Sequence, residues 1–175
     1  TRAWLDDGAA NVTLDTLINQ GKAVPMVVVM PHAYGTAAGP VDIDHLDMLP
    51  TYTRILLEEV IPQVEKQYNV SAEPNGRAMA GLSMGGALTC WLASRHPELA
   101  GIVCINPAVQ PSADMMAFVE QMVAAGEDWL PEIAGDIADP DAVEVGGYDA
   151  TPVKPLLSMF DAAEAFGPDL SKIAC

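Results

Sequence analysis

Short, solid apolar runs alternate with longer segments in which apolar residues recur every three or four positions, between residues 11 and 105. This alternation is typical of a parallel sheet with crossover helices, because such strands are buried on both faces whereas each helix keeps one face in solvent. The predicted strands are 26–30, 77–80 and 102–105, and the predicted helices are 11–20, 51–68 and 85–95. The sequence therefore predicts an α/β fold.

Breaker residues fix the ends of these elements. Gly21 follows the first helix as its stop, and Pro62 lies inside the second, where we expect it to kink the helix. His96 and Pro97 end the third helix, and a polar loop rich in Gly and Pro spans residues 31–50. A chain of this length supports one domain with one core.

The pattern changes after Asn106. From 107 to 167 the helical stretches are short and no convincing strand appears; the prolines that interrupt them are Pro111, Pro131, Pro140, Pro152 and Pro155. We predict a helical cap over residues 107–167, inserted into an α/β core made of residues 1–106 and 168–175 that is incomplete at both ends.

The predicted cap carries bulky and flexible apolar residues: Met115, Met116, Phe118, Met122, Trp129, Met159, Phe160 and Phe166. Such side chains suit a lid that shapes an acyl-chain pocket. They equally suit ordinary amphipathic packing of the helices against the core. Both interpretations stay open at the level of sequence.

The stretch from Gly81 to Gly85 reads Gly-Leu-Ser-Met-Gly and lies between a predicted strand and a predicted helix. That context is the one in which a G-x-S-x-G motif forms a nucleophile elbow. We expect Gly81 and Gly85 to remove steric clashes across the tight turn, which presents the Ser83 hydroxyl as nucleophile. The backbone N–H of Met84, at the start of the helix, is the predicted oxyanion donor.

Two stretches around this motif resemble known hydrolases. Residues 14–86, through the strings 21–31 and 77–86, resemble the esterase D and feruloyl esterase type of α/β-hydrolase. Residues 88–175, through 101–108 and 151–155, resemble bacterial monoacylglycerol lipases and carboxylesterases. The resemblance implies an α/β-hydrolase fold and a serine nucleophile, and it leaves the choice between the two substrate classes open.

The other catalytic residues of such a hydrolase are not recognisable in this chain. In the α/β-hydrolase order the acid and then the histidine follow the serine, yet His96 is the sole histidine after Ser83. It lies at the far end of the helix, roughly 15–20 Å from the hydroxyl at 1.5 Å per residue, and cannot act as base. Asp161 and Glu164 precede the strand expected to carry the acid. We therefore expect the chain to be an internal portion of a hydrolase, lacking the triad Asp and His and the second oxyanion donor.

Two loop features have alternative interpretations. His32 and Tyr34 follow the strand predicted at 26–30 and are expected near the mouth of the pocket, where His32 is a candidate for an atypical base. Asp42, Asp44, His45 and Asp47 offer ligands for a cation. We favour a solvated loop that caps the next helix over a metal site.

The chain has 24 acidic and 8 basic residues, a net charge of −16. Binding of nucleic acid requires a basic face and is not expected. No stretch reaches the ~18 apolar residues of a membrane span, so we expect no stable membrane insertion, and no cofactor motif is present. Cys90, Cys104 and Cys175 fit neither a zinc site nor a disulfide framework and are interpreted as buried thiols.

The leading functional hypothesis is a carboxylic ester hydrolase that forms an acyl-enzyme on Ser83 and acts on a small neutral or apolar ester, namely a short-chain, monoacylglycerol or aryl ester. An acyltransferase with the same serine machinery is one alternative. The other is a binding protein with an α/β-hydrolase fold that lacks the late Asp and His. With an incomplete sheet, we expect this polypeptide alone to be poorly soluble and at most weakly active.

Overall fold

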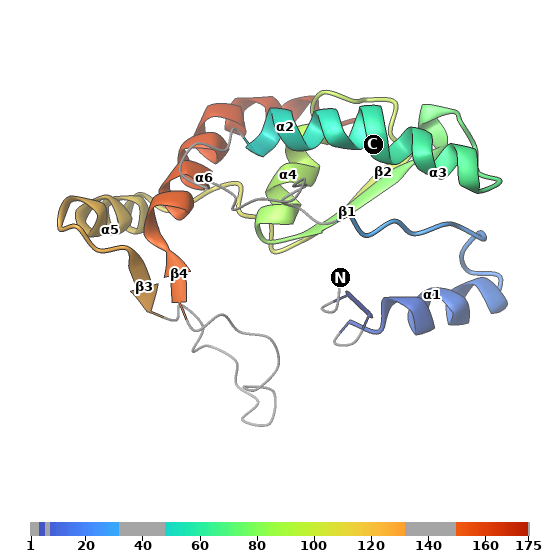
Figure 1. Ribbon diagram of the computed structural model, residues 1–175, viewed down its shortest axis with the longest axis horizontal. Helices are drawn as coiled ribbons and strands as arrows, with labels where there is room; N and C mark the ends of the chain where they lie inside the picture. The colour runs from blue at the N-terminus through green and yellow to red at the C-terminus, as the bar shows by residue number, and fades with distance from the viewer. Residues whose placement is uncertain (1–3, 6–7, 32–47, 132–149, 175) are drawn as a thin grey trace.

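The computed structural model describes residues 4–5, 8–31, 48–131 and 150–174, and Figure 1 shows the arrangement of their elements. In chain order these elements are α1 (Ala10–Asn19), α2 (Met48–Ile55), the π-helical turn η3 (Leu56–Val60), α3 (Ile61–Gln67), the 3-10 turn η4 (Pro74–Gly76), β1 (Ala78–Leu82), α4 (Met84–Ala93), β2 (Gly101–Ile105), α5 (Ala113–Ala124), β3 (Trp129–Pro131), β4 (Ala150–Pro152), α6 (Val153–Phe166) and the 3-10 segment η6 (Gly167–Lys172).

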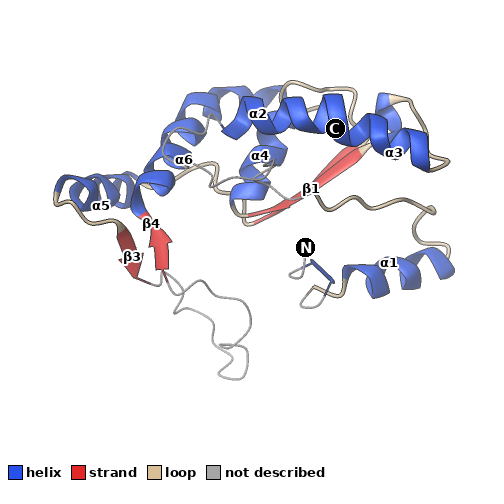
Figure 2. Ribbon diagram, viewed as in Figure 1, coloured by secondary structure: helices blue, strands red, loops and turns tan. Residues whose placement is uncertain are grey.

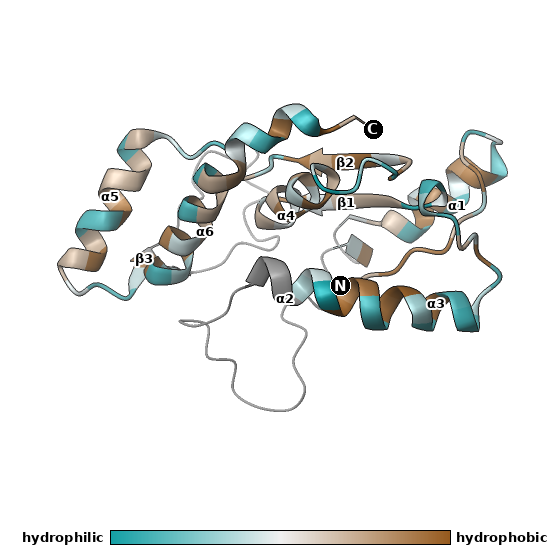
Figure 3. Ribbon diagram, turned by 90° about the horizontal axis from the view of Figure 1, so that it is seen from above, coloured by the Kyte–Doolittle hydropathy of each residue, from teal (hydrophilic) through white to brown (hydrophobic). Residues whose placement is uncertain are grey.

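A parallel strand pair joined by a helix positions the candidate site. β1 pairs with β2 in a register that runs from Ala78 opposite Gly101 to Leu82 opposite Ile105. The crossover helix α4 packs on both strands, and its buried residues are Gly86, Ala87, Thr89, Cys90, Leu92 and Ala93. Figure 3 shows α4 against the two strands from above. The predicted α/β class and two of the three predicted strands are confirmed.

The strand predicted at Met26–Met30 is not formed. Residues 24–31 have no helical or strand assignment, and the side chains of Val24, Met26 and Val28 are 73%, 49% and 47% exposed. A strand requires a neighbouring backbone for its N–H and C=O groups, and the described residues provide none for this segment. The prediction of a buried strand at this apolar, β-branched run is therefore wrong for the part of the chain that the structure describes.

The helices before β1 end where breakers predict. Gly21 takes a left-handed φ of +68°, while the N–H of Gly21 bonds to the carbonyl of Ile18 and that of Lys22 to Leu17, which closes α1. The helix predicted over 51–68 forms as α2, η3 and α3. Pro62 has no N–H to donate one turn back, and the adjoining turn η3 is π-helical; the kink expected at Pro62 stays a prediction.

The region after β2 contains two strands that the sequence pattern missed. β3 and β4 pair antiparallel, with Leu130 opposite Thr151, and Figure 2 marks both strands in red beside α5 and α6. Both strands are only three residues long and end at a proline, so no alternating pattern of apolar and polar residues could develop.

Ser112 caps helix α5 by accepting a hydrogen bond from the Met115 N–H at 3.2 Å. The boundaries predicted for the core and the cap stay a prediction.

In the described part of the chain, buried side chains gather in two clusters. The elbow cluster consists of Ala87, Cys90, Ala163 and Phe166, and the insertion cluster consists of Val119, Leu130, Val153 and Phe160. Helix α6 contributes to both clusters and so connects α4 with α5. Of the side chains that the structure describes before Gly81, none is buried.

Most of the bulky residues predicted for the cap pack in these clusters. Phe166 belongs to the elbow cluster, and Phe160 to the insertion cluster, which Met115, Met116, Met122 and Met159 also contact. Phe118 and Trp129 are 48% and 60% exposed. Ordinary packing thus accounts for most of the set. No helix in the described part of the chain is long and apolar enough to cross a membrane.

Candidate active site

Ser83 lies at the junction between β1 and α4, with its side chain exposed. Its backbone has φ 52° and ψ −117°, a combination that residues with a Cβ rarely adopt. Ser83 is the single residue between the end of the strand and the start of the helix, so the turn is sharp. This is the backbone conformation expected of a nucleophile elbow.

Backbone hydrogen bonds fix the elbow to the segment that follows β2. The N–H of Ser83 donates to the Ile105 carbonyl at 3.0 Å. The Ser83 carbonyl accepts from the N–H groups of Ala87 and Ala108, at 3.0 and 3.1 Å. Strand β2, helix α4 and the segment after β2 each form a hydrogen bond with the backbone of Ser83, and these bonds stabilise its strained conformation.

Close backbone packing requires glycine at two positions of the elbow. A Cβ added to Gly81 would lie 2.1 Å from the Gly85 carbonyl oxygen, and one added to Gly86 would lie 2.9 Å from Pro107. A Cβ on Gly85 itself meets no described atom within 4 Å. The clash that we expected for a side chain at Gly85 is therefore not found. Gly85 contributes to the turn through its backbone, with which a side chain at Gly81 would clash.

Met84 is the first residue of α4. The N–H groups in the first turn of a helix have no acceptor in the helix itself and point along its axis with the positive end of the helix dipole. The role of the Met84 N–H as oxyanion donor stays a prediction, and the position of Met84 at the start of α4 is consistent with it.

Asn106 is a feature of the site that sequence reasoning missed. It directly follows β2 and has a φ of 43°, so two adjacent parallel strands are each followed by a residue with positive φ. Asn tolerates this conformation better than most residues. The sequence signal was the Asn-Pro pair at 106–107, which favours a turn directly after an apolar run.

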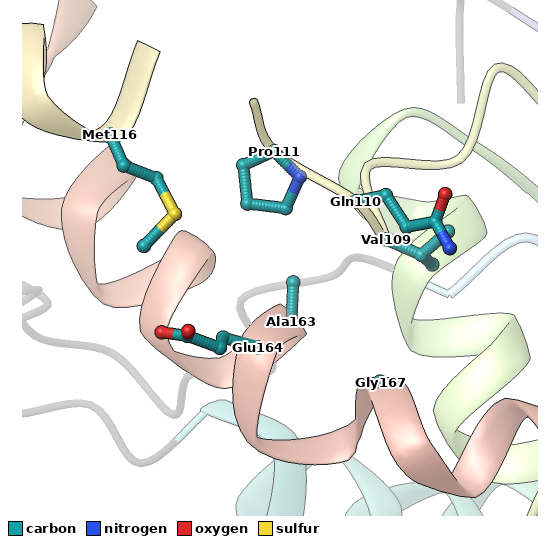
Figure 4. Close-up of a pocket in the computed structure, with 7 residues that line it drawn as sticks. All are labelled: Val109, Gln110, Pro111, Met116, Ala163, Glu164 and Gly167. Atoms are coloured by element: carbon teal, nitrogen blue, oxygen red, sulfur yellow. The ribbon is translucent and has the colours of Figure 1, made fainter. Parts of the chain in front are cut away.

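A pocket lies beside the elbow cluster, between the segment after β2 and the helices α5 and α6. Its volume is about 230 Å³, and its lining residues are Val109, Gln110, Pro111, Met116, Ala163, Glu164 and Gly167. In Figure 4, Met116, Pro111 and Ala163 border the same space from three segments. Val109 is the residue after Ala108, whose N–H is bonded to Ser83. Apart from Glu164 and Gln110, the lining is apolar.

The structure does not bring His96 to the elbow. His96 lies past the end of α4, its N–H bonds to the Leu92 carbonyl, and its Nδ1 is 3.0 Å from Glu98 Oε1. Backbone and His96 hydrogen bonds to Glu98 lower the pKa of this exposed carboxyl. His32, Tyr34, Asp42, Asp44, His45 and Asp47 lie outside the described residues. Among the residues described, no group of His, Cys, Asp and Glu has the arrangement of a metal site.

Charged groups near α4 gather at the end opposite Ser83. The Arg95 guanidinium lies 4.3 Å from the centre of the Trp91 ring and 3.5 Å from Asp169. Lys172 lies 2.6 Å from the same carboxyl, and its hydrogen bond lowers the pKa of Asp169. These contacts attach η6 to the C-terminal end of α4.

Known proteins match this chain over the region that contains the elbow. A thermostable monoacylglycerol lipase from a Bacillus species is 38% identical over 99 residues, which cover 55% of this chain and 38% of the lipase. An endo-1,4-beta-xylanase/feruloyl esterase from Xylanibacter ruminicola is 35% identical over 106 residues, 57% of this chain and 14% of that protein. The chain thus matches less than half the length of either relative.

A family model described as "Putative esterase" matches residues 2–144, well over half of the chain. The matched range includes the parallel pair β1–β2, the elbow and α5. The chain therefore belongs to the putative esterase family and has a partial α/β-hydrolase fold.

Proposed function

We propose that the chain carries the nucleophile of a carboxylic ester hydrolase. Ser83 Oγ attacks the ester carbonyl, the Met84 N–H stabilises the tetrahedral oxyanion, and the alcohol leaves as the acyl group stays on Ser83. Water then cleaves this acyl-enzyme. No residue of this chain is assigned as the base that accepts the Ser83 proton or as the acid that orients that base.

The observation that carries the proposal is the backbone of Ser83. An exposed serine with φ 52° and ψ −117°, directly between a parallel strand and a helix, is a costly conformation, and cost of this kind accumulates at functional sites. Because the chain belongs to an esterase family, we interpret this conformation as the one that exposes a serine hydroxyl for acyl transfer at the N-terminus of a helix.

We propose a short, neutral and apolar ester as the substrate. The names of the two relatives point to monoacylglycerol and feruloyl esters. The pocket beside the elbow is mostly apolar, and its 230 Å³ lies below the ~300–1,000 Å³ usual for ligand pockets, which favours a short chain. Glu164 at the pocket and the net charge of −16 disfavour an anionic substrate.

We propose that the segment 107–167 carries the substrate pocket. All the residues that line the pocket belong to this segment: Val109, Gln110 and Pro111 come from the stretch before α5, and Met116, Ala163, Glu164 and Gly167 come from α5, α6 and the start of η6. In this proposal the 107–167 segment determines which acyl or alcohol group fits, and the β1–α4–β2 unit supplies the nucleophile.

Hydrolysis of p-nitrophenyl acetate, butyrate and octanoate by the complete gene product tests the proposal. Ser83→Ala should lower kcat/KM at least a hundredfold, whereas Ser158→Ala, an exposed serine on α6, should leave it unchanged. Activity of Ser83→Ala within twofold of the parent would contradict the proposal. Added alcohol that diverts most of the acyl group from water would identify an acyltransferase instead.

A further inference from the structure

Two thiols face each other directly behind the elbow. Cys90 on α4 and Cys104 on β2 have their Sγ atoms 3.6 Å apart, and both are free thiols. Cys90 is 7% exposed and belongs to the elbow cluster, while Cys104 is half-buried and packs against that cluster. The site already described uses neither sulfur.

The fold holds this contact in place. In the sheet register Cys104 lies opposite Gly81, and its Sγ is 3.8 Å from the Gly86 carbonyl oxygen, so the thiol points to α4. Cys90 projects from the buried face of α4, which packs on β2. A disulfide bond is about 2.05 Å long, so bond formation requires the sulfurs to approach by about 1.5 Å.

We propose that Cys90 and Cys104 are a modification site, at which a peroxide or a disulfide oxidant links them in a reversible intramolecular disulfide. With hydrogen peroxide, the more accessible Cys104 thiol loses its proton, its sulfur takes one oxygen, and one water is released. The Cys90 sulfur then attacks the sulfur of the resulting sulfenic acid while the Cys90 proton passes to the leaving hydroxyl, so the S–S bond forms and a second water leaves. Two thiols and one peroxide thus yield one disulfide and two waters.

The bond would connect the helix that begins at the nucleophile turn to the neighbouring strand. Cys90 is six residues after Met84, about 9 Å along the helix axis, so the link leaves the proposed oxyanion donor untouched. It closes a loop between residues 14 apart in sequence, which restricts the unfolded chain. We expect oxidation to raise the Tm by roughly 5–10 °C.

Peptide mapping tests the proposal independently of ester hydrolysis. Trypsin places the three cysteines in different peptides: Cys90 in 78–95, Cys104 in 96–172, where Lys154 precedes proline, and Cys175 in 173–175. After reduction and then hydrogen peroxide at neutral pH, the 175-residue chain should lose about 2 Da and yield the linked pair 78–95 and 96–172. Dithiothreitol should restore both free peptides.

Variants and a denatured control make the result decisive. Cys90→Ser and Cys104→Ser should each abolish the mass loss and the Tm increase, whereas Cys175→Ser should retain both. In 8 M urea, where all three thiols pair at random, the Cys90–Cys104 link should lose its preference. Sulfinic acid on Cys104 without a link, or links to Cys175 as frequent in the folded as in the denatured chain, would overturn the proposal.

Discussion

The Ala108 N–H donates a hydrogen bond to the Ser83 carbonyl oxygen at 3.1 Å. This bond attaches the segment after β2 to the turn that presents the candidate nucleophile. Since Val109, the next residue, lines the pocket, this hydrogen bond links the pocket wall to the turn that carries Ser83. A shift of the elbow would therefore displace the pocket as well.

The three elbow glycines should respond differently to alanine. Gly81→Ala places a methyl 2.1 Å from a backbone oxygen and should destabilise the fold by more than about 3 kcal/mol. Gly86→Ala meets Pro107 at 2.9 Å and should cost about 1–3 kcal/mol. Urea unfolding followed by circular dichroism measures both losses.

Gly85→Ala is the matched control. Its methyl meets no described atom within 4 Å, and alanine favours helix over glycine by up to about 1 kcal/mol, so this variant should be as stable as the parent or slightly more stable. A loss at Gly85 equal to the loss at Gly81 would show that the elbow is packed differently from this structure.

Met116 should control the chain length of the substrate. It borders the pocket from α5, and Met116→Ala lengthens the cavity, so kcat/KM for octanoate relative to butyrate should rise about three- to tenfold. Phe118→Ala is the control, because Phe118 lies on the same helix, is 48% exposed and does not line the pocket. Equal chain-length profiles for both variants would rule out this pocket as the acyl or alcohol site.

The Cys90 thiol should resist alkylation until strongly alkaline pH. Burial, and secondarily the neighbouring Cys104, raise the pKa of Cys90 to about 11 from the ordinary 9.0. The folded state holds the proton more tightly than the unfolded state, so this group contributes stability below pH 9 that is lost as pH rises through 11. Iodoacetamide labelling of Cys90 from pH 7 to 11 should follow this rise; fast labelling near pH 8 would contradict it.

Local sequence signals predicted the elements that form from local causes. Gly21 closes α1 and the apolar run at 102–105 forms β2, each because one or a few residues dictate the backbone. The elbow was predictable for the same reason, since Gly81 and Ser83 must occupy a tight strand-to-helix turn.

Features that depend on distant partners were not predictable. The apolar run at 26–30 has no strand partner among the described residues, because pairing depends on a neighbouring backbone rather than on the residues of the run itself. The hairpin β3–β4 brings together residues about twenty positions apart with strands too short for a pattern. The need for glycine at 86 arises from Pro107, and the Cys90–Cys104 contact from helix packing, so neither could be read from spacing.

Reaction of the complete gene product with a fluorophosphonate probe tests the central claim most directly, because such probes bond covalently to serines that act as nucleophiles. We predict that tryptic mapping finds the probe on Ser83 within peptide 78–95, that Ser83→Ala abolishes labelling and that Ser158→Ala does not. Labelling on another serine, or labelling that persists unchanged in Ser83→Ala, would contradict the assignment of Ser83 as the nucleophile.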